Sequence, residues 1–242
     1  MRVIKNRNAA GTCINIGEDA QRNQDRQHAC KDRKSAKEKF SQGTFAKLFC
    51  RLFFIFHIQT VPEALQFKAE TPNSLACGEV GGLPPEGFDF GNSPTQTRLL
   101  DLSGKIIVQR TGAGTQGIAR SVNATTMLAA SLVVTNATVT YLRKLAPDVV
   151  TFVITGQTES ERGDEDLACA EYFEALLKDQ QPQPAPFIER VIGSRDARMH
   201  LDPKFPEFPI TDIEYCTTID MFNFAMLVTK ANGRHVMRAV KP

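Results

Sequence analysis

From residue 52 onward the chain alternates short apolar runs with segments of helical periodicity. Apolar runs that are rich in Phe, Val and Ile and are bounded by turn residues predict buried strands. The predicted strands are LFFIFHI (52–58), SLACG (74–78), KIIVQRT (105–111), LAASLVVT (128–135) and VVTFVITG (149–156).

The segments between these strands predict helices, because their apolar residues recur at helical spacing or follow capping residues. In NATVTYLRKLAPD (136–148), Asn136 is a candidate helix cap. The other predicted helices are VPEALQFKAETP (61–72), IARSVNAT (118–125), DEDLACAEYFEALLKDQ (164–180) and FIERVIGSRDARMHL (187–201).

The segment FAMLVTKANGRHVMRAV (224–240) predicts two strands around Asn232-Gly233, a dipeptide that is typical of hairpin turns. Strands that alternate with helices predict an α/β fold with a mainly parallel sheet, helices on both faces and this C-terminal hairpin. Ligands bind such sheets at the carboxyl ends of the strands. We therefore expect the loops 78–94, 112–117 and 156–166 to meet at one end of a domain spanning residues 52–242.

Residues 1–51 differ from the rest of the chain, because they hold 12 Lys/Arg against 5 Asp/Glu and have almost no apolar periodicity. We interpret them as a basic arm of atypical composition, solvated and disordered in character. Nucleic-acid binding is the alternative for such an arm. No interleaved aromatic residues support it, so we expect no nucleic-acid partner.

The composition of the 242-residue chain, with 42% hydrophobic residues, allows a sizeable core. Its six cysteines form no CxxC pair, and its four histidines show no zinc-binding spacing. Reduced thiols in a cytoplasmic protein are the favoured interpretation. The apolar run 52–58 is far shorter than the roughly 20 residues that cross a bilayer, so we expect no membrane association.

The segment GEVGGLPPEGFDFGNSP (78–94) combines five glycines and three prolines with three carboxylates. Glycine allows the backbone to approach a ligand closely. The carboxylates Glu79, Glu86 and Asp89 offer oxygen ligands of the kind that Mg²⁺ prefers. An acidic surface turn is the alternative interpretation, but the density of glycine and acid, followed by Asn92 and Ser93, favours a site.

A second glycine-rich segment, RTGAGTQG (110–117), lies between a predicted strand and a predicted helix. Free N–H groups in such a turn can bind an anion. The segment is neither a Walker A loop nor a complete GxGxxG motif. A tight strand-to-helix turn without a ligand therefore remains an equal alternative.

Two further acidic segments carry candidate residues. Asp164, Glu165 and Asp166 begin a predicted helix, where acids also complement the helix dipole. Asp220 lies in the apolar run YCTTIDMF, and a capping or surface carboxylate is its alternative role. Cys216 in the same run is more typical of a small buried hydrophobic residue than of a nucleophile.

These motifs together resemble the 2-phosphosulfolactate phosphatase family. Its signature is a G-E-x-G-G segment followed by G-F-D-x-G-N-S-P, which GEVGGLPPEGFDFGNSP matches. RTGAGTQG resembles the family's T-N-G-T turn, VVTNATVTYL its asparagine-alanine segment, VITGQTESERGDEDLACAEYFEALL its acid-acid helix start and DIEYCTTID its C-terminal block. The resemblance covers about residues 60–240.

The resemblance implies a cytoplasmic, Mg²⁺-dependent α/β phosphatase. Such an enzyme hydrolyses the small-molecule phosphate ester 2-phospho-3-sulfolactate to sulfolactate and phosphate, a step towards coenzyme M. It also implies site residues at the matching positions. These are Glu79, Asp89 and Asp220 for catalysis; Asn92, Ser93, Gly114, Thr115 and Asn136 for substrate; and Glu79, Asp89, Glu165 and Asp166 for Mg²⁺.

One departure leaves an alternative open. The family usually opens with a strand that ends in D-x-x-R-A-T, and residues 1–51 do not contain this motif. The alternative is therefore a catalytically impaired relative that binds an anionic metabolite without turnover. The sequence does not decide which acid is nucleophile, base or metal ligand, and it leaves a homo-oligomer open.

Overall fold

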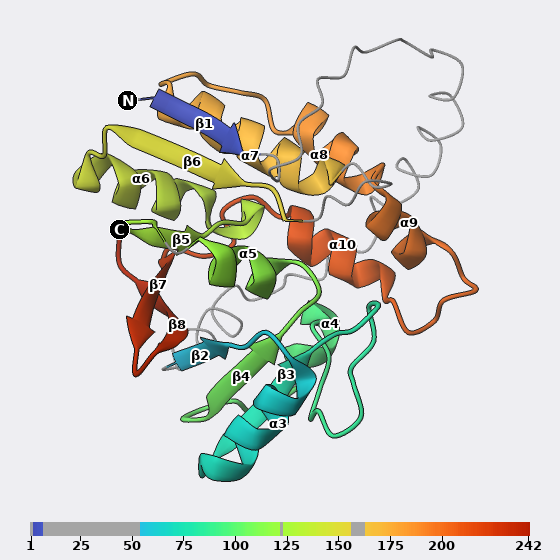
Figure 1. The fold of residues 1–242 in the computed structure, drawn as a ribbon. Helices are drawn as coiled ribbons and strands as arrows, with labels where there is room; N and C mark the ends of the chain where they lie inside the picture. The colour runs from blue at the N-terminus through green and yellow to red at the C-terminus, as the bar shows by residue number, and fades with distance from the viewer. Residues whose placement is uncertain (1, 7–53, 122, 156–162) are drawn as a thin grey trace.

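The computed structural model describes residues 2–6, 54–121, 123–155 and 163–242. Within them, one sheet has the strand order β3-β4-β2-β8-β7-β5, and β1 pairs with β6 in a separate ladder (Figure 1). The strands are β1 (Arg2–Asn6), β2 (Phe54–His57), β3 (Ser74–Gly78), β4 (Ile106–Arg110), β5 (Met127–Ala129), β6 (Val149–Val153), β7 (Ala225–Ala231) and β8 (Arg234–Val240).

The larger sheet is mixed rather than mainly parallel. Strands β2, β3 and β4 are parallel to one another, whereas β8 pairs with β2, β7 with β8 and β5 with β7 in antiparallel ladders. The cause is the C-terminal hairpin, which adds to the open edge of β2. Its turn residues Asn232 and Gly233 both have positive φ, 51° and 76°, as the predicted hairpin turn requires.

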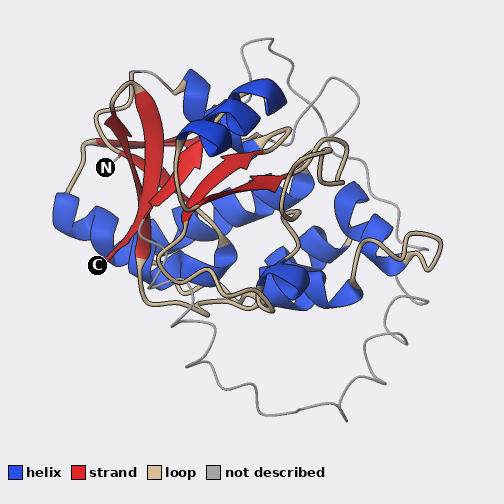
Figure 2. Ribbon diagram, turned by 90° about the horizontal axis from the view of Figure 1, so that it is seen from below, coloured by secondary structure: helices blue, strands red, loops and turns tan. Residues whose placement is uncertain are grey.

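Helices lie on both sides of the strands, as the sequence predicted (Figure 2). Helix α3 begins with a capping box, in which Thr60 and Glu63 exchange side-chain and backbone hydrogen bonds. The helices are α3 (Val61–Glu70), α4 (Pro94–Thr97), α5 (Gly114–Arg120), α6 (Thr135–Leu145), α7 (Asp164–Leu177), α8 (Ala185–Ile192), α9 (Arg195–Leu201) and α10 (Ile210–Thr217).

Two apolar clusters position the parallel strands. Phe67 of α3 packs on Phe56 of β2 with ring centroids 4.7 Å apart, and the fully buried Val108 of β4 belongs to the same cluster. In the second cluster, Phe173 of α7 packs against Phe152 of β6. These clusters hold the carboxyl ends of β2, β3, β4 and β6 in place.

Three sequence predictions were wrong in detail. The segment 128–135 forms only the short strand β5, followed by a 3₁₀ turn (η2, Leu132–Val134) that buries Leu132 and Val134. The predicted helix 187–201 is two helices, since Ser194 caps α9 immediately after α8 ends. The helix predicted at 118–125 is α5, which begins earlier, at Gly114 within the glycine-rich segment, and ends at Arg120.

Of the basic arm, the structure describes only Arg2–Asn6, which pairs in parallel with Val149–Val153. Residues 7–53 lie outside the described residues, so the arm's predicted disorder and the domain boundary at residue 51 stay predictions.

Cys77, Cys169 and Cys216 carry free thiols, and the reduced state of the six cysteines in the cell stays a prediction. The other three cysteines fall outside the described part of the chain.

Candidate functional site

Strand β3 ends in a position that only glycine fits. Gly78 has a φ of 130°, and a Cβ added to it would stand 1.8 Å from the carbonyl oxygen of Arg110. This close approach lets the next residue, Glu79, donate its N–H to the same carbonyl at 3.0 Å. The ends of β3 and β4 are therefore joined where the acidic loop begins.

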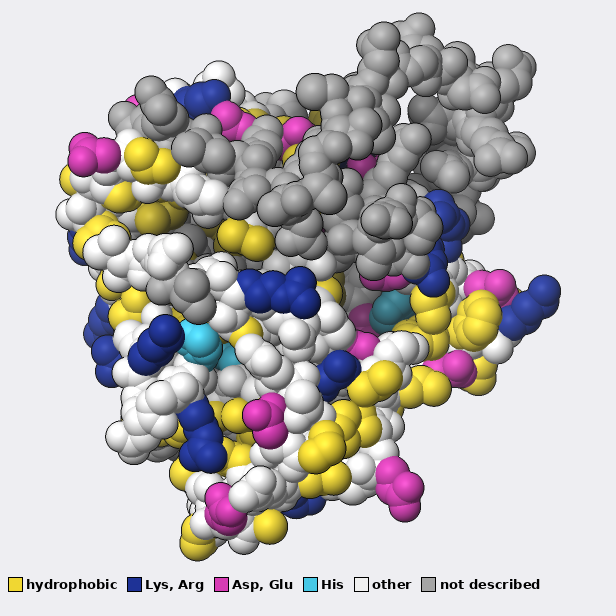
Figure 3. Space-filling model, in the orientation of Figure 1, with side chains coloured by type: hydrophobic (Ala, Val, Ile, Leu, Met, Phe, Trp, Pro, Cys, Tyr) yellow, Lys and Arg dark blue, Asp and Glu magenta, His cyan; other side chains and the backbone are white. Residues whose placement is uncertain are grey.

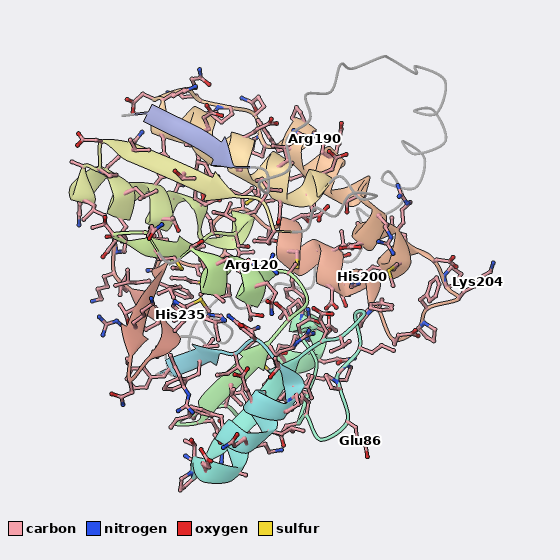
Figure 4. All side chains as sticks on the ribbon, viewed as in Figure 1. Glu86, Arg120, Arg190, His200, Lys204 and His235 are labelled. Atoms are coloured by element: carbon pink, nitrogen blue, oxygen red, sulfur yellow. The ribbon has the colours of Figure 1, made fainter. Side chains whose placement is uncertain are left out.

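The Glu79 carboxylate connects the acidic loop to the glycine-rich turn. One oxygen accepts from the N–H of Gly112, and the other accepts from the N–H of Gly82 at 3.0 Å. The predicted meeting of the loops 78–94 and 112–117 is confirmed by these contacts. Glu86, by contrast, lies at the exposed tip of the loop (Figure 4).

The turn after β4 is held by two threonines. The N–H of Thr111 donates to the buried Thr115 hydroxyl, and the N–H of Thr115 donates to the Thr111 hydroxyl, each at 3.1 Å. Thr115 therefore uses its N–H inside the turn. Gly114 is exposed, and its N–H finds no acceptor among the described residues. Of the two predicted substrate-binding positions in the turn, Gly114 is the one with a backbone donor to offer.

Arg110 brings a cation to the same place. Its Nη1 donates to the carbonyl of Glu79 at 2.7 Å and its Nε to the carbonyl of Gln59 at 3.3 Å. Gln116 also donates to the Gln59 carbonyl, at 3.1 Å. Sequence analysis missed Arg110, although an arginine at a strand end immediately before a glycine turn is a recognisable signal for an anion site.

The carboxyl end of β6 reaches the same turn. A Cβ added to Gly117 would stand 2.3 Å from Cγ2 of Thr155, so helix α5 packs directly on this strand end. Thr155 donates its N–H and its hydroxyl to Oδ2 of Asp166, at 2.8 and 3.0 Å. Asp166 is thereby fixed on the first turn of α7. Most of the predicted third loop, 156–162, lies outside the described residues.

Glu165, the neighbour of Asp166, is half-buried among other acids. Burial first, and then the carboxylates of Asp166, Asp196 and Asp164, raise its pKa. A bound cation would offset the negative charge that gathers around Glu165. This electrostatic pattern is the strongest support that the structure offers for the predicted metal role of Glu165 and Asp166.

Asp89 and Asn92 are placed differently from Glu79. Asp89 accepts from the N–H of Ala76 at 2.7 Å and from Lys68 Nζ at 2.8 Å, so it anchors the acidic loop along β3 and α3. Asn92 is exposed. Both observations describe loop structure, and the catalytic, metal and substrate roles assigned to these two residues stay predictions.

Ser93 caps α4 and also contacts a buried carboxylate that sequence analysis missed. Its hydroxyl donates to Oδ1 of Asp212 at 2.9 Å, and the N–H of Thr95 donates to the same oxygen at 2.9 Å. Asp212 is only 4% exposed. It lies within DIEYCTTID, as Asp220 does, and nothing in the local pattern distinguishes a buried aspartate from an exposed one.

Asp220 and Asn136 form a pair. The Asp220 carboxylate accepts from the N–H of Asn136 and from its Nδ2, each at 2.6 Å. The expectation that Asn136 caps the helix was wrong, since α6 begins one residue earlier, at Thr135, and takes its acceptor from Asp220. A distant aspartate thus replaces the local cap.

Replacing Asp220 with alanine is expected to lower the free energy of unfolding by about 1–2 kcal/mol, because the first turn of α6 loses its acceptor. Urea unfolding followed by circular dichroism measures this loss. Asp148→Ala is the matched control, because Asp148 is exposed just beyond the other end of α6. Equal stability of the two variants would show that the Asp220–Asn136 pair contributes nothing.

The described cysteines are unsuited to nucleophilic attack. Burial, followed by the charge of Asp89, raises the pKa of the Cys77 thiol to about 12. Burial, followed by the charge of Asp166, raises that of Cys169 to about 12. Both thiols therefore stay protonated at neutral pH, and a thiolate mechanism gains no support from them.

The candidate residues are thus brought together in pairs around the turn 112–117 rather than in one cluster. Glu79 contacts one end of the turn and Thr155 with Asp166 the other. Among the described residues, no three His, Cys, Asp or Glu side chains gather in a way that could hold a metal ion. Any metal bound here would take one or two protein ligands.

Comparison with known proteins agrees with this arrangement of loops. The sequence model of the 2-phosphosulpholactate phosphatase family matches residues 50–199. The chain belongs to this family. The match includes the acidic loop, the glycine-rich turn and the start of α7, whereas Asp212 and Asp220 lie beyond it.

Individual relatives in the family agree. A Bacillus subtilis protein named "Probable 2-phosphosulfolactate phosphatase" is 30% identical over 173 residues, which are 71% of this chain and 75% of that protein. A Thermotoga petrophila protein of the same name is 29% identical over 75% of this chain and 80% of its own length. One from Carboxydothermus hydrogenoformans is 36% identical over 52% of each chain. Separately, none of the helices in the described ranges has the length and apolar character to span a bilayer.

Proposed function

We propose that the chain is a Mg²⁺-dependent phosphomonoester hydrolase that acts on 2-phospho-3-sulfolactate at the turn 112–117. The observation that carries the proposal is the Glu79 carboxylate, which joins the acidic loop to Gly112 at the ends of β3 and β4. Membership of the phosphatase family supports the reaction type. The substrate is taken from the names of the relatives.

The turn supplies two kinds of group for a phosphoryl anion. The exposed N–H of Gly114 can donate to a phosphoryl oxygen. The Arg110 guanidinium, held against the carbonyls of Glu79 and Gln59, places a positive charge at the same strand ends. Glu79 keeps this turn in one position. Positioning of this kind is a major part of phosphoryl-transfer catalysis.

The carboxylates of Asp166 and Glu165 fit a magnesium ion. Mg²⁺ commonly takes one or two carboxylates and completes its shell with water and substrate phosphate, so a three-residue cluster is not required. The negative charge of the aspartates around Glu165 favours a cation there. A bound ion would neutralise charge on the phosphoryl oxygens. Asp89 is placed differently, because its oxygens accept from Lys68 and from the N–H of Ala76, and its predicted metal role stays a prediction.

The second candidate is an impaired relative that binds an anionic metabolite without turnover. It is favoured by one observation, the absence of a D-x-x-R-A-T strand from residues 1–51. The two candidates predict the same binding site but differ in phosphate release. Calorimetric binding of sulfolactate or phosphate without phosphate release from 2-phospho-3-sulfolactate would favour the second.

Chelation with EDTA is expected to lower phosphate release at least about 100-fold, and added Mg²⁺ is expected to restore it, because metal stabilisation of the transition state is worth several kcal/mol. Asp166→Asn should mimic chelation while keeping the fold, since an amide oxygen still accepts from Thr155. Asp148→Asn is the control, because Asp148 is an exposed acid outside this acidic group. Release of phosphate that EDTA leaves unchanged would refute the magnesium requirement.

A further inference from the structure

Two histidines lie side by side on neighbouring strands of the larger sheet. His57 of β2 is directly opposite His235 of β8 in the antiparallel ladder. Residues directly opposite in a ladder point to the same face, with Cβ atoms about 4.5–5.5 Å apart. Figure 4 shows His235 beside the β7–β8 hairpin, and Figure 3 shows histidine at the surface in that place.

The ring nitrogens of this pair are buried without partners. Neither Nδ1 nor Nε2 of His57, nor Nε2 of His235, has a hydrogen bond among the described residues. His57 is 9% exposed. Buried polar atoms are nearly always satisfied in proteins, by protein groups, water or ions. Three unpartnered nitrogens in one cross-strand pair therefore indicate a ligand.

Burial disfavours the charged, protonated form of both rings. Burial, followed by the charge of His235, lowers the pKa of His57 to about 4. Burial, followed by Lys230, lowers the pKa of His235. Neutral imidazole offers the lone pair that a metal ion needs. Lys230 is exposed, so solvent screens its repulsion of a cation.

We propose that His57 and His235 form a two-imidazole site for a transition-metal ion such as Zn²⁺. Imidazole nitrogen suits Zn²⁺, Cu²⁺ and Ni²⁺, whereas Mg²⁺ takes oxygen ligands. Gln109 is the register partner of His57 on the other side and brings an amide to the same face. No third His, Cys, Asp or Glu joins the pair within the described residues, so the two imidazoles are the ligands that these residues offer.

This site is independent of the proposed phosphatase function. It uses nitrogen ligands from β2 and β8, whereas the magnesium proposal uses carboxylates on α7. Zn²⁺ binding at the histidine pair would therefore persist in Asp166→Asn, and loss of the pair would leave the magnesium ligands in place. Failure of one proposal does not imply failure of the other.

The test is calorimetric titration of the chelator-stripped full chain with Zn²⁺, in excess Mg²⁺. We expect one Zn²⁺ site, and we expect His235→Gln to lower its affinity for Zn²⁺ at least about tenfold. Loss of a group that merely orients a metal ligand already costs about this much affinity, so loss of the ligand itself should cost no less. His200→Gln is the matched control, because Nδ1 of His200 already contacts the carbonyl of Pro209 at 3.0 Å. That variant should bind Zn²⁺ as the unaltered chain does.

A second measurement, thermal unfolding with and without Zn²⁺, distinguishes loss of the metal site from misfolding of a variant. Zn²⁺ should raise the thermal midpoint of the unaltered chain and of His200→Gln, but not that of His235→Gln or His57→Gln. The same thermal scans without metal show whether each variant is folded. Binding that is absent in the unaltered chain, or equally tight in His235→Gln, overturns the proposal, since any such zinc is held by other residues.

Discussion

Gly78→Ala is expected to lower the free energy of unfolding by at least about 3 kcal/mol. Two costs add up: backbone strain, because residues with a side chain avoid this φ, and overpacking by the added Cβ. The added Cβ would stand 1.8 Å from the carbonyl oxygen of Arg110, a backbone atom that cannot move aside without separating β3 from β4. The thermal midpoint should fall by roughly 10 °C for a chain of this size. Differential scanning calorimetry measures the change.

Gly81→Ala is the control for this prediction. Gly81 also has a positive φ, 63°, but a Cβ there meets nothing within 4 Å. Its substitution should cost only about 1 kcal/mol of backbone strain. If both variants lose the same stability, the close approach of Gly78 to Arg110 is not what requires glycine at the end of β3.

Glu79→Gln is expected to lower kcat/KM for phosphate release at least about 100-fold. The amide nitrogen of glutamine would face the N–H of Gly112 or of Gly82, so one of the two contacts becomes a repulsion between donors. The glycine-rich turn then moves, and displacement of a positioning group by about 1 Å can cost this much activity. The free energy of unfolding should fall by about 1–3 kcal/mol.

Glu86→Gln is the matched control for charge, because Glu86 is an exposed acid of the same loop. It removes one negative charge without touching the turn and should leave kcat/KM unchanged. Restoration of activity by Glu79→Asp is not expected, since the shorter side chain cannot reach both N–H groups. Full activity in Glu79→Gln would show that catalysis does not depend on the two hydrogen bonds that Glu79 accepts.

Much of the local structure follows from the sequence. Strand β3 has the predicted bounds, Ser74–Gly78, because an apolar run ends at a glycine. The Asn232-Gly233 turn was also predicted correctly, because its two positive φ values suit these residues. Such signals lie within a few residues of one another and need no knowledge of the rest of the fold.

Other features depend on contacts between distant segments. The antiparallel part of the sheet arises because β8 occupies the edge of β2, and no local pattern states which edge a hairpin joins. The segment LVV (132–134) has the composition of a strand but forms a 3₁₀ turn, whose Leu132 carbonyl accepts from the N–H of Asp220. Tertiary contacts override propensity at this point.

In the candidate site, too, some features follow from the local sequence and others depend on contacts between distant segments. The sequence placed Glu79 and the glycine-rich turn at neighbouring strand ends, and the structure joins them by a hydrogen bond. The sequence did not show that Glu79 and Asp89 have different roles, because they lie in one loop and their different hydrogen-bond partners come from distant segments. Asp212 was missed because its burial depends on Ser93 and Thr95, more than 100 residues away in the chain.

The central claim is that the turn 112–117 binds the phosphoryl group. Amide resonances followed by two-dimensional NMR during titration with inorganic phosphate and Mg²⁺ test it most directly. We expect the largest saturable shifts at Gly112 and Gly114, with none at Gly104, an exposed glycine turn before β4. Shifts that are confined to other residues, or no saturable shift in the turn, would contradict the assignment of this site.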